Sequence, residues 1–206
     1  MAFFEQGITE VRTDKTGSTG DENAHEVKSI GAKALIVLGQ DRPMVETTGG
    51  FTSVGLEREA EGLVLQSLTH AQAIEIGEIG FAKARARALP VTVEVRLGEW
   101  TVFKAVLPGA KPEQDSWVAR KARVVMATGN STIFERVAAE ERGVDWYAET
   151  GLSEELHAIH GGGFALNVAD KGLVGILLIS GLPQIEDHLL GVEVITEYLA
   201  RQGENA

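Results

Sequence analysis

The most regular pattern in the chain is Pro90-Val-Thr-Val-Glu-Val-Arg-Leu-Gly-Glu-Trp-Thr-Val-Phe-Lys-Ala-Val-Leu107. Apolar residues occupy every second position from Val91 to Leu97, a period of two that is typical of a half-buried β-strand. Gly98-Glu99 supplies a tight turn, and Trp100 to Leu107 returns as the partner strand of a hairpin. The pattern therefore predicts a pair of antiparallel strands.

Helical patterns flank this hairpin on both sides. Thr69 is a suitable N-cap for a helix that runs through Arg87 and is stopped by Pro90. Asp115 or Ser116 is expected to cap a second helix. The further elements predicted are a helix over 117–128, a helix over 132–142, strands over 164–168 and 173–180, and a last helix over 186–201. Hairpins that alternate with helices indicate an α+β domain.

Composition excludes several classes of protein. The chain has 206 residues, a net charge of −11 and no cysteine. An acidic chain is a poor match for nonspecific binding to nucleic acid or to an anionic membrane, because both need a basic surface. The absence of cysteine excludes disulfides and thiolate chemistry, and the longest apolar runs are too short to span a bilayer. These features predict a cytoplasmic protein.

Residues 1–55 differ from the rest of the chain. They hold eight of the 24 glycines and many threonines, with one apolar run over 34–38 that is consistent with a short strand. We expect this segment to be a loosely structured or interface-forming extension, followed by one domain over 56–206.

The sequence His160-Gly-Gly-Gly163 stands immediately before a predicted strand. The amides of Gly161, Gly162 and Gly163 can approach a ligand closely and bind an anion. The plainer interpretation is a flexible loop. The motif also occurs in esterases, but the chain lacks the G-x-S-x-G sequence that accompanies it there. His157 and His160 are three residues apart and could chelate a metal ion if they lay on one helical turn.

Asp187-His188 opens the last predicted helix. His188 begins an apolar stripe that continues through Val192, Ile195 and Leu199. A histidine near a helix N-terminus tends to stay neutral, and a neutral imidazole ligates iron or accepts a proton. The alternative is a capping aspartate beside a packed histidine.

Trp117, Arg120 and Lys121 share one side of their predicted helix. Two cations beside an aromatic ring suit a flat ligand that carries carboxylates. The alternative is that both cations only extend along the helix edge toward solvent.

The order of these motifs resembles that of a known family. Val102-Phe-Lys-Ala-Val-Leu-Pro-Gly109, Trp117-Val-Ala-Arg-Lys121, His160-Gly-Gly-Gly-Phe164 and Ser180-Gly-Leu-Pro183 precede Asp187-His188. Together they are similar to the GlcG/HbpS-like heme-degrading-domain superfamily, in its branch of short bacterial proteins. The resemblance covers about residues 56–200. After Arg120-Lys121, relatives carry an aromatic-His-Arg-Ser-Ser run, whereas this chain reads Ala127-Thr-Gly-Asn-Ser-Thr132.

The resemblance implies a profilin-like fold, with α/β/α layers around a five-stranded antiparallel sheet, in a dimer or larger homo-oligomer. It also implies heme as the possible cofactor, with His160 or His188 as the iron ligand. Arg120 and Lys121 would then pair with propionates, and Trp117, Ser180 and the three glycines would line the pocket.

Three functions follow as hypotheses. The first is a protein that binds a small anionic or aromatic ligand, with heme as the leading candidate. The second is an enzyme without an organic cofactor that acts on a small carboxylate or aromatic catabolic intermediate. In it, His188, held by Asp187 or another carboxylate, is the general base, and the glycine amides stabilise an oxyanion. The third is an accessory or structural subunit.

Overall fold

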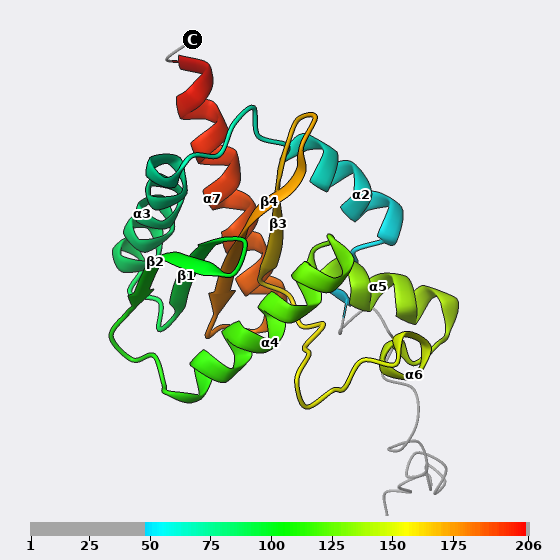
Figure 1. The fold of residues 1–206 in the computed structure, drawn as a ribbon. Helices are drawn as coiled ribbons and strands as arrows, with labels where there is room; N and C mark the ends of the chain where they lie inside the picture. The colour runs from blue at the N-terminus through cyan, green and yellow to red at the C-terminus, as the bar shows by residue number, and fades with distance from the viewer. Residues whose placement is uncertain (1–47, 205–206) are drawn as a thin grey trace, which may run out of the picture. The chain divides into compact units, whose positions relative to one another are not determined.

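A computed structural model describes residues 48–204 of the chain (Figure 1). The predicted strand at 34–38 and most of the predicted extension lie outside these residues. The helices are α2 (Ser53–Gly62), α3 (His70–Ala86), α4 (Glu113–Thr128), α5 (Thr132–Arg142), α6 (Trp146–Thr150) and α7 (Gln184–Glu204). The strands are β1 (Thr92–Leu97), β2 (Trp100–Val106), β3 (Gly163–Val168) and β4 (Gly172–Ser180).

The strands form one antiparallel sheet in the order β2-β1-β4-β3. The predicted hairpin is confirmed, with Val93 opposite Ala105. The described residues hold four strands in this sheet, so the expectation of five is wrong. Leu65 makes only a single parallel bridge to Val168 at the β3 edge, and two backbone hydrogen bonds of 2.8 Å hold it there. The segment between α2 and α3 touches the sheet edge at this one residue, which is too little to form a strand.

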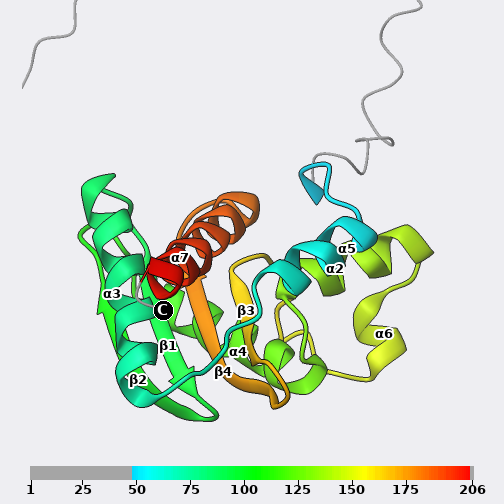
Figure 2. The ribbon, with the colours of Figure 1, turned by 90° about the horizontal axis from the view of Figure 1, so that it is seen from above.

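Helices cover both faces of the sheet. α3 and α7 contact one face and α4 the other, as the two ribbon views show (Figures 1 and 2). Alternate residues of β4 separate the two cores, because successive side chains of a strand point to opposite faces. Leu177 and Ile179 pack with the α3 and α7 side, whereas Ile176 and Leu178 pack with α4. The α+β class is confirmed.

The predicted helices form with small shifts at their ends. Thr69 caps α3 in a full capping box with Gln72. α4 begins at Glu113, earlier than predicted, so Asp115 lies inside the first turn and is not the cap; Pro112 precedes the helix and makes no side-chain cap. The extra turn places Gln114 against the sheet, where its side chain bonds Thr92 and the carbonyl of Pro90.

The folded region includes residues before position 56. Phe51 and Leu56 pack with Ile133 and Val137 of α5, and Thr52 caps α2. α2 therefore belongs to the same packed unit as the sheet. None of the helices in the described region is long and apolar enough to cross a membrane.

Candidate functional site

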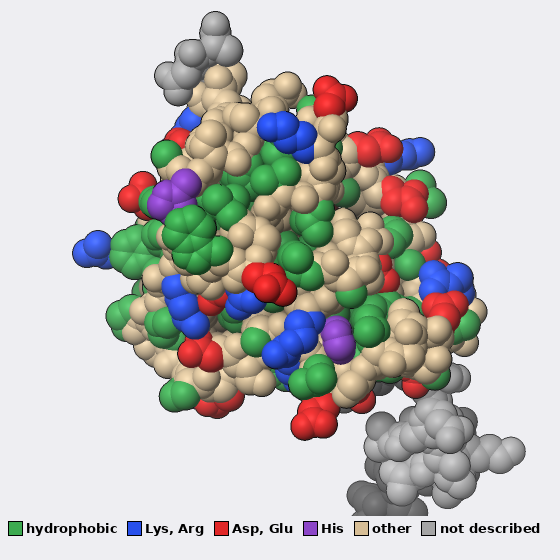
Figure 3. All heavy atoms as spheres, in the orientation of Figure 1, with side chains coloured by type: hydrophobic (Ala, Val, Ile, Leu, Met, Phe, Trp, Pro, Cys, Tyr) green, Lys and Arg blue, Asp and Glu red, His purple; other side chains and the backbone are tan. Residues whose placement is uncertain are grey.

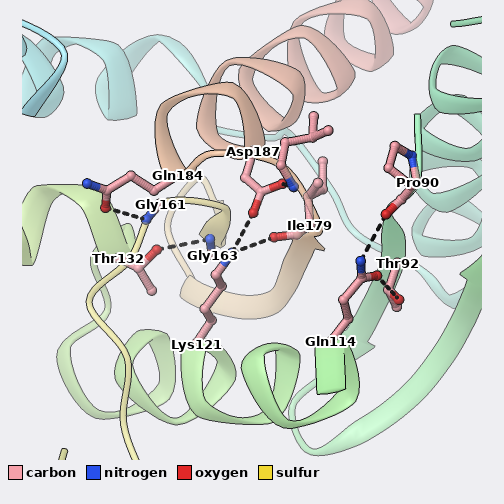
Figure 4. Close-up of polar contacts among 11 residues, drawn as sticks. Pro90, Thr92, Gln114, Lys121, Thr132, Gly161, Gly163, Ile179, Gln184 and Asp187 are labelled. Atoms are coloured by element: carbon pink, nitrogen blue, oxygen red, sulfur yellow. Dashed lines mark hydrogen bonds and ion pairs between the residues drawn. The ribbon is translucent and has the colours of Figure 1, made fainter. Parts of the chain in front are cut away.

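A cavity of about 320 Å³ lies where α4, the end of β4 and the start of α7 meet. Its lining includes five residues that the sequence singled out and several that it did not. The former are Trp117, Lys121, His160, Ser180 and Asp187; the latter include Pro90, Lys111, Glu113, Gln114, Leu182 and Gln184. Figure 4 shows how several of these side chains converge from separate elements.

The cavity wall contains a buried ion pair. Lys121 Nζ of α4 lies 2.9 Å from Asp187 Oδ2 of α7 and donates a second hydrogen bond of 2.8 Å to the carbonyl of Ile179 (Figure 4). Both charged residues are only 2% exposed. The amide of Leu182 donates to the other carboxylate oxygen, Asp187 Oδ1, at 3.0 Å. The pair therefore joins α4, β4 and α7 at one point.

Burial shifts both groups of this pair toward their neutral forms. Removal from water lowers the pKa of Lys121, against the attraction of Asp187. Burial likewise raises the pKa of Asp187, against the opposing charge of Lys121 and the hydrogen bond from Leu182. Each partner therefore needs the other to stay charged.

The glycine loop Gly161–Gly163 passes close to the Lys121–Asp187 pair. The space there leaves no room for side chains on the loop. Gly162 has φ of +107°, and a Cβ there would lie 2.3 Å from the Ile179 oxygen and 2.9 Å from Lys121 Nζ. The amides of Gly161 and Gly163 donate to the side chains of Gln184 and Thr132. These two amides are thus used inside the protein, and the glycines pack the loop onto β4 and α7.

His160 stands at the wall of the cavity beside Trp117. The two rings meet edge to face with centroids 4.9 Å apart. Nδ1 of His160 is buried and has no hydrogen-bond partner within residues 48–204. Burial, with added repulsion from Arg136, Lys121 and Arg120, lowers the pKa of His160 to about 4. The imidazole is therefore neutral at physiological pH.

His160 also lines a second, more open cavity of about 440 Å³ on the side of α5 and α6, with Arg136 and Tyr147. The histidine thus separates two hollows.

Arg120 faces away from the first cavity. Its guanidinium stacks on Trp117 at 4.6 Å and donates to the carbonyls of Glu154 at 2.7 Å and His157 at 3.3 Å. These contacts hold the segment before the glycine loop against α4. The two neighbouring cations of α4 therefore have different surroundings, since Lys121 is in the cavity wall and Arg120 is outside it.

His188 points to the other side of α7 from Asp187. It is fully buried, and its Nε2 lies 2.8 Å from Glu59 Oε1 of α2. Its ring stacks on Phe164 and meets Phe51 edge to face, with centroids 4.9 and 5.2 Å apart. Of the carboxylates that the sequence left open as its partner, the structure selects Glu59.

The structure brings five of the ten predicted site residues to the first cavity and leaves five outside its lining. The cavity is lined by Trp117, Lys121, His160, Ser180 and Asp187, but not by Arg120, His188, Gly161, Gly162 or Gly163. Sequence reasoning missed Gln114, which no motif marks, and Glu59, whose helix was not predicted. Within the described region no group of three or more histidine or acidic side chains is arranged to hold a metal ion.

The space-filling view shows how charge is distributed around these elements. On the face drawn in Figure 3, acidic, basic and apolar side chains are interspersed, without an extended patch of one sign. The charge that a ligand meets is therefore set by groups close to it.

Comparison with known proteins places the chain in a family. A family model described as haem-degrading protein HbpS-like matches residues 68–196. The chain belongs to the HbpS-like family. A UPF0303 protein of Streptomyces avermitilis is 35% identical over 158 residues, covering 77% of this chain and 97% of the relative. A UPF0303 protein of Streptomyces coelicolor is 34% identical over 148 residues, covering 72% and 94%.

Solved structures share the fold of the HbpS-like family with this chain. The Ybr137w protein superposes with a TM-score of 0.68 at 21% identity, covering 77% of this chain and 95% of that one. PduOC in complex with heme superposes with a TM-score of 0.54 at 20% identity, covering 63% and 94%. Every residue that lines the first cavity lies inside the family match, whereas Phe51 and Glu59, which enclose His188, lie before it.

Proposed function

We propose that this protein binds a ligand of the heme type at the first cavity, with His160 as the residue that would ligate iron. One observation carries the proposal. His160 presents a neutral imidazole at the cavity wall, and its Nδ1 has no hydrogen-bond partner among the residues described. Membership of the HbpS-like family and the likeness to PduOC in complex with heme support the choice of ligand.

The donor chemistry fits such a group. His160 would hold the iron of such a group through an imidazole nitrogen, and the iron would supply redox chemistry when bound. His160 stays neutral because burial opposes the imidazolium, and a neutral imidazole has one nitrogen with a free lone pair. The neighbouring Trp117 ring offers an apolar edge for a flat ligand. Nδ1 of His188 also lacks a hydrogen-bond partner among the described residues, but His188 does not line the first cavity. Its ring is enclosed by Phe51 and Phe164, and its Nε2 is held by Glu59.

The charges of the site differ from the predicted arrangement. Lys121 is paired with Asp187, and Arg120 donates to backbone carbonyls, so neither is a free partner for a propionate. Lys111 lines the cavity mouth and is exposed. The cavity is at the lower end of the range of about 300–1,000 Å³ for ligand pockets. A tetrapyrrole held by His160 would therefore extend beyond the cavity.

The test is a hemin titration followed by absorption spectroscopy. We expect a saturable shift of the Soret band in the wild type and in His188→Ala, and its loss in His160→Ala. A weak, nonsaturating shift that is equal in all three proteins would mean adventitious adsorption and would remove heme from the proposal.

A second candidate function is an enzyme for a small carboxylate or aromatic intermediate. The size of the cavity favours it, because about 320 Å³ is enough to accommodate such a molecule. In this candidate His160 replaces the predicted His188 as general base, since it lines the cavity and stays unprotonated above about pH 4. Turnover of a panel of small carboxylates should then vanish in His160→Ala and persist in His188→Ala. Turnover that is unchanged in His160→Ala would exclude this role.

Assembly into a homo-oligomer remains a prediction. Light scattering on the full chain and on a variant without residues 1–47 tests it. Dividing the measured mass by the mass of one protomer gives the number of protomers. The same number in both proteins would exclude an assembly role for residues 1–47.

A further inference from the structure

We propose that Lys121 is a nucleophile that forms an imine with a small aldehyde entering the first cavity, with Asp187 as the proton carrier. This inference rests on the same cavity as the proposed function, but it uses neither His160 nor an iron centre. The two proposals can therefore fail separately.

The geometry of Lys121 Nζ leaves one position open. A neutral amine has two N–H bonds and one lone pair in a tetrahedral arrangement. Nζ has two acceptors within hydrogen-bond distance, the carbonyl of Ile179 at 2.8 Å and Asp187 Oδ2 at 2.9 Å (Figure 4). These acceptors take two of the three positions around Nζ and leave the third open. After a proton has moved to Asp187 Oδ2, rotation about the Cε–Nζ bond brings the lone pair to this third position. Lys121 belongs to the cavity lining, so an electrophile in the cavity can meet it.

The local environment makes the neutral amine more accessible than it is in water. Burial lowers the pKa of Lys121 and raises that of Asp187. Transfer of the ammonium proton to Asp187 Oδ2 therefore costs less here than in water. Desolvated lysines of this kind are the ones that proteins use to form Schiff bases.

The chemistry balances with these groups alone. Lys121 passes one proton to Asp187, and the free amine attacks the carbonyl carbon. A C–N bond forms as the C–O π bond breaks, and a proton moves from the nitrogen to the carbonyl oxygen. The resulting carbinolamine loses its hydroxyl as water, with the proton for that water supplied by the Asp187 carboxylic acid. The net reaction converts the Lys121 ammonium and an aldehyde to a protonated imine and one water, and Asp187 ends as the carboxylate. No oxidant or reductant is consumed.

The cavity lining favours a neutral carbonyl compound. Lys111 and Glu113 both line the mouth and their charges cancel, as do those of Lys121 and Asp187. His160 is uncharged at neutral pH. With no net charge to match a carboxylate, the site suits an aldehyde with a flat apolar body that packs against Trp117.

Reductive trapping tests the inference on the full-length protein. The probe is benzaldehyde with sodium cyanoborohydride near neutral pH, with intact mass spectrometry and peptide mapping as the readout. We expect a benzyl adduct on Lys121 that forms faster than on Lys111, since a lowered pKa gives more free amine at neutral pH. Lys111 is the internal control, because it is exposed at the mouth of the same cavity.

Variants assign the roles of the two groups. Lys121→Arg should lose the fast adduct, Lys111→Arg should retain it, and Asp187→Asn should slow it by at least about tenfold if the carboxyl carries the proton. The site of labelling in the wild type needs no variant and so is independent of folding defects. Labelling of Lys111 and other exposed lysines with Lys121 unmodified would overturn the inference. Glyoxylate in place of benzaldehyde should label Lys121 more slowly, and faster labelling would refute the preference for a neutral compound.

His160→Ala separates this inference from heme binding. We expect it to lose the Soret shift and to keep the fast adduct on Lys121. Loss of the adduct in this variant, with its circular dichroism unchanged, would contradict the independence of the two groups.

Discussion

The two sides of the first turn of α7 contrast sharply in what surrounds them. Asp187 faces a cavity and pairs with a lysine from α4, whereas His188, the next residue, is fully enclosed by α2 and β3. Adjacent residues of a helix point about 100° apart, so one dipeptide serves two environments. The polar side carries groups whose pKa values are shifted and which border a ligand-sized space. On the other side, His188 packs against Phe51 and Phe164.

This contrast has a counterpart in the family match. The Asp187 side is built entirely from residues within 68–196, whereas the enclosure of His188 also uses Phe51 and Glu59. The cavity is thus part of the region that this chain has in common with the HbpS-like family. The neighbouring enclosure depends on the segment that precedes it. We infer that ligand chemistry belongs to the first side and stabilisation of α2 to the second.

The largest expected effect is on the Asp187 side. Lys121→Met leaves Asp187 buried without its partner, which should lower the free energy of unfolding by about 3–5 kcal/mol. Asp187→Leu should cost a similar amount for the same reason. The double variant Lys121→Met/Asp187→Leu removes both charges and should be more stable than either single variant. Urea denaturation of all four proteins measures this, and additive losses in the double variant would show that the pair is not coupled.

A smaller effect is expected on the His188 side. His188→Ala removes a buried ring that stacks on Phe164, which should cost about 2–3 kcal/mol through the cavity it leaves. Glu59→Gln, which keeps a hydrogen-bonding side chain for Nε2, should cost less. Urea denaturation gives these values, and a hemin titration of the same variants gives the control. If either substitution abolished the Soret shift, the division between the two sides of α7 would fail.

The sequence was sufficient to predict the helices and strands whose apolar residues recur with a clear period. Alternation in 91–97, the Thr69 cap and the apolar repeat of the last helix predicted β1, α3 and α7 to within a few residues. α2 was missed because Leu56 is its only buried residue and glycines lie at both ends, so it shows little periodicity. Leu65 could not be placed in the sheet because one bridging residue leaves no pattern.

The sequence predicted which residues belong to the site better than it predicted which of them contact one another. The motifs named Lys121, Asp187 and His160, and the structure places all three at one cavity. Sequence position could not show that Asp187 would face α4, because that depends on how α7 is rotated against the sheet. Nor could it show that Glu59, 129 residues from His188, would supply the carboxylate that holds it. Contacts between distant segments require the packed tertiary structure.

The smallest expected effect is on the pH dependence of stability, because His160 is only half-buried and solvent screens part of the shift in its pKa. This effect tests His160 directly. The pKa of His160 is about 4 in the folded protein, below the ordinary value of 6.5, so below about pH 6.5 the unfolded chain binds a proton that the folded protein does not. The free energy of unfolding should therefore fall as the pH is lowered from about 7 to about 4. His160→Gln removes this contribution and should show a shallower decline, whereas His188→Gln gives the matched control at a buried histidine that is not in the cavity wall.

Protonation of Asp187 acts in the opposite direction, because burial raises its pKa in the fold, but it is common to all these proteins. Urea denaturation at several pH values measures the slopes. Equal slopes for the wild type and His160→Gln would show that the imidazole is not held neutral, and would remove the property on which its role as an iron ligand or general base depends.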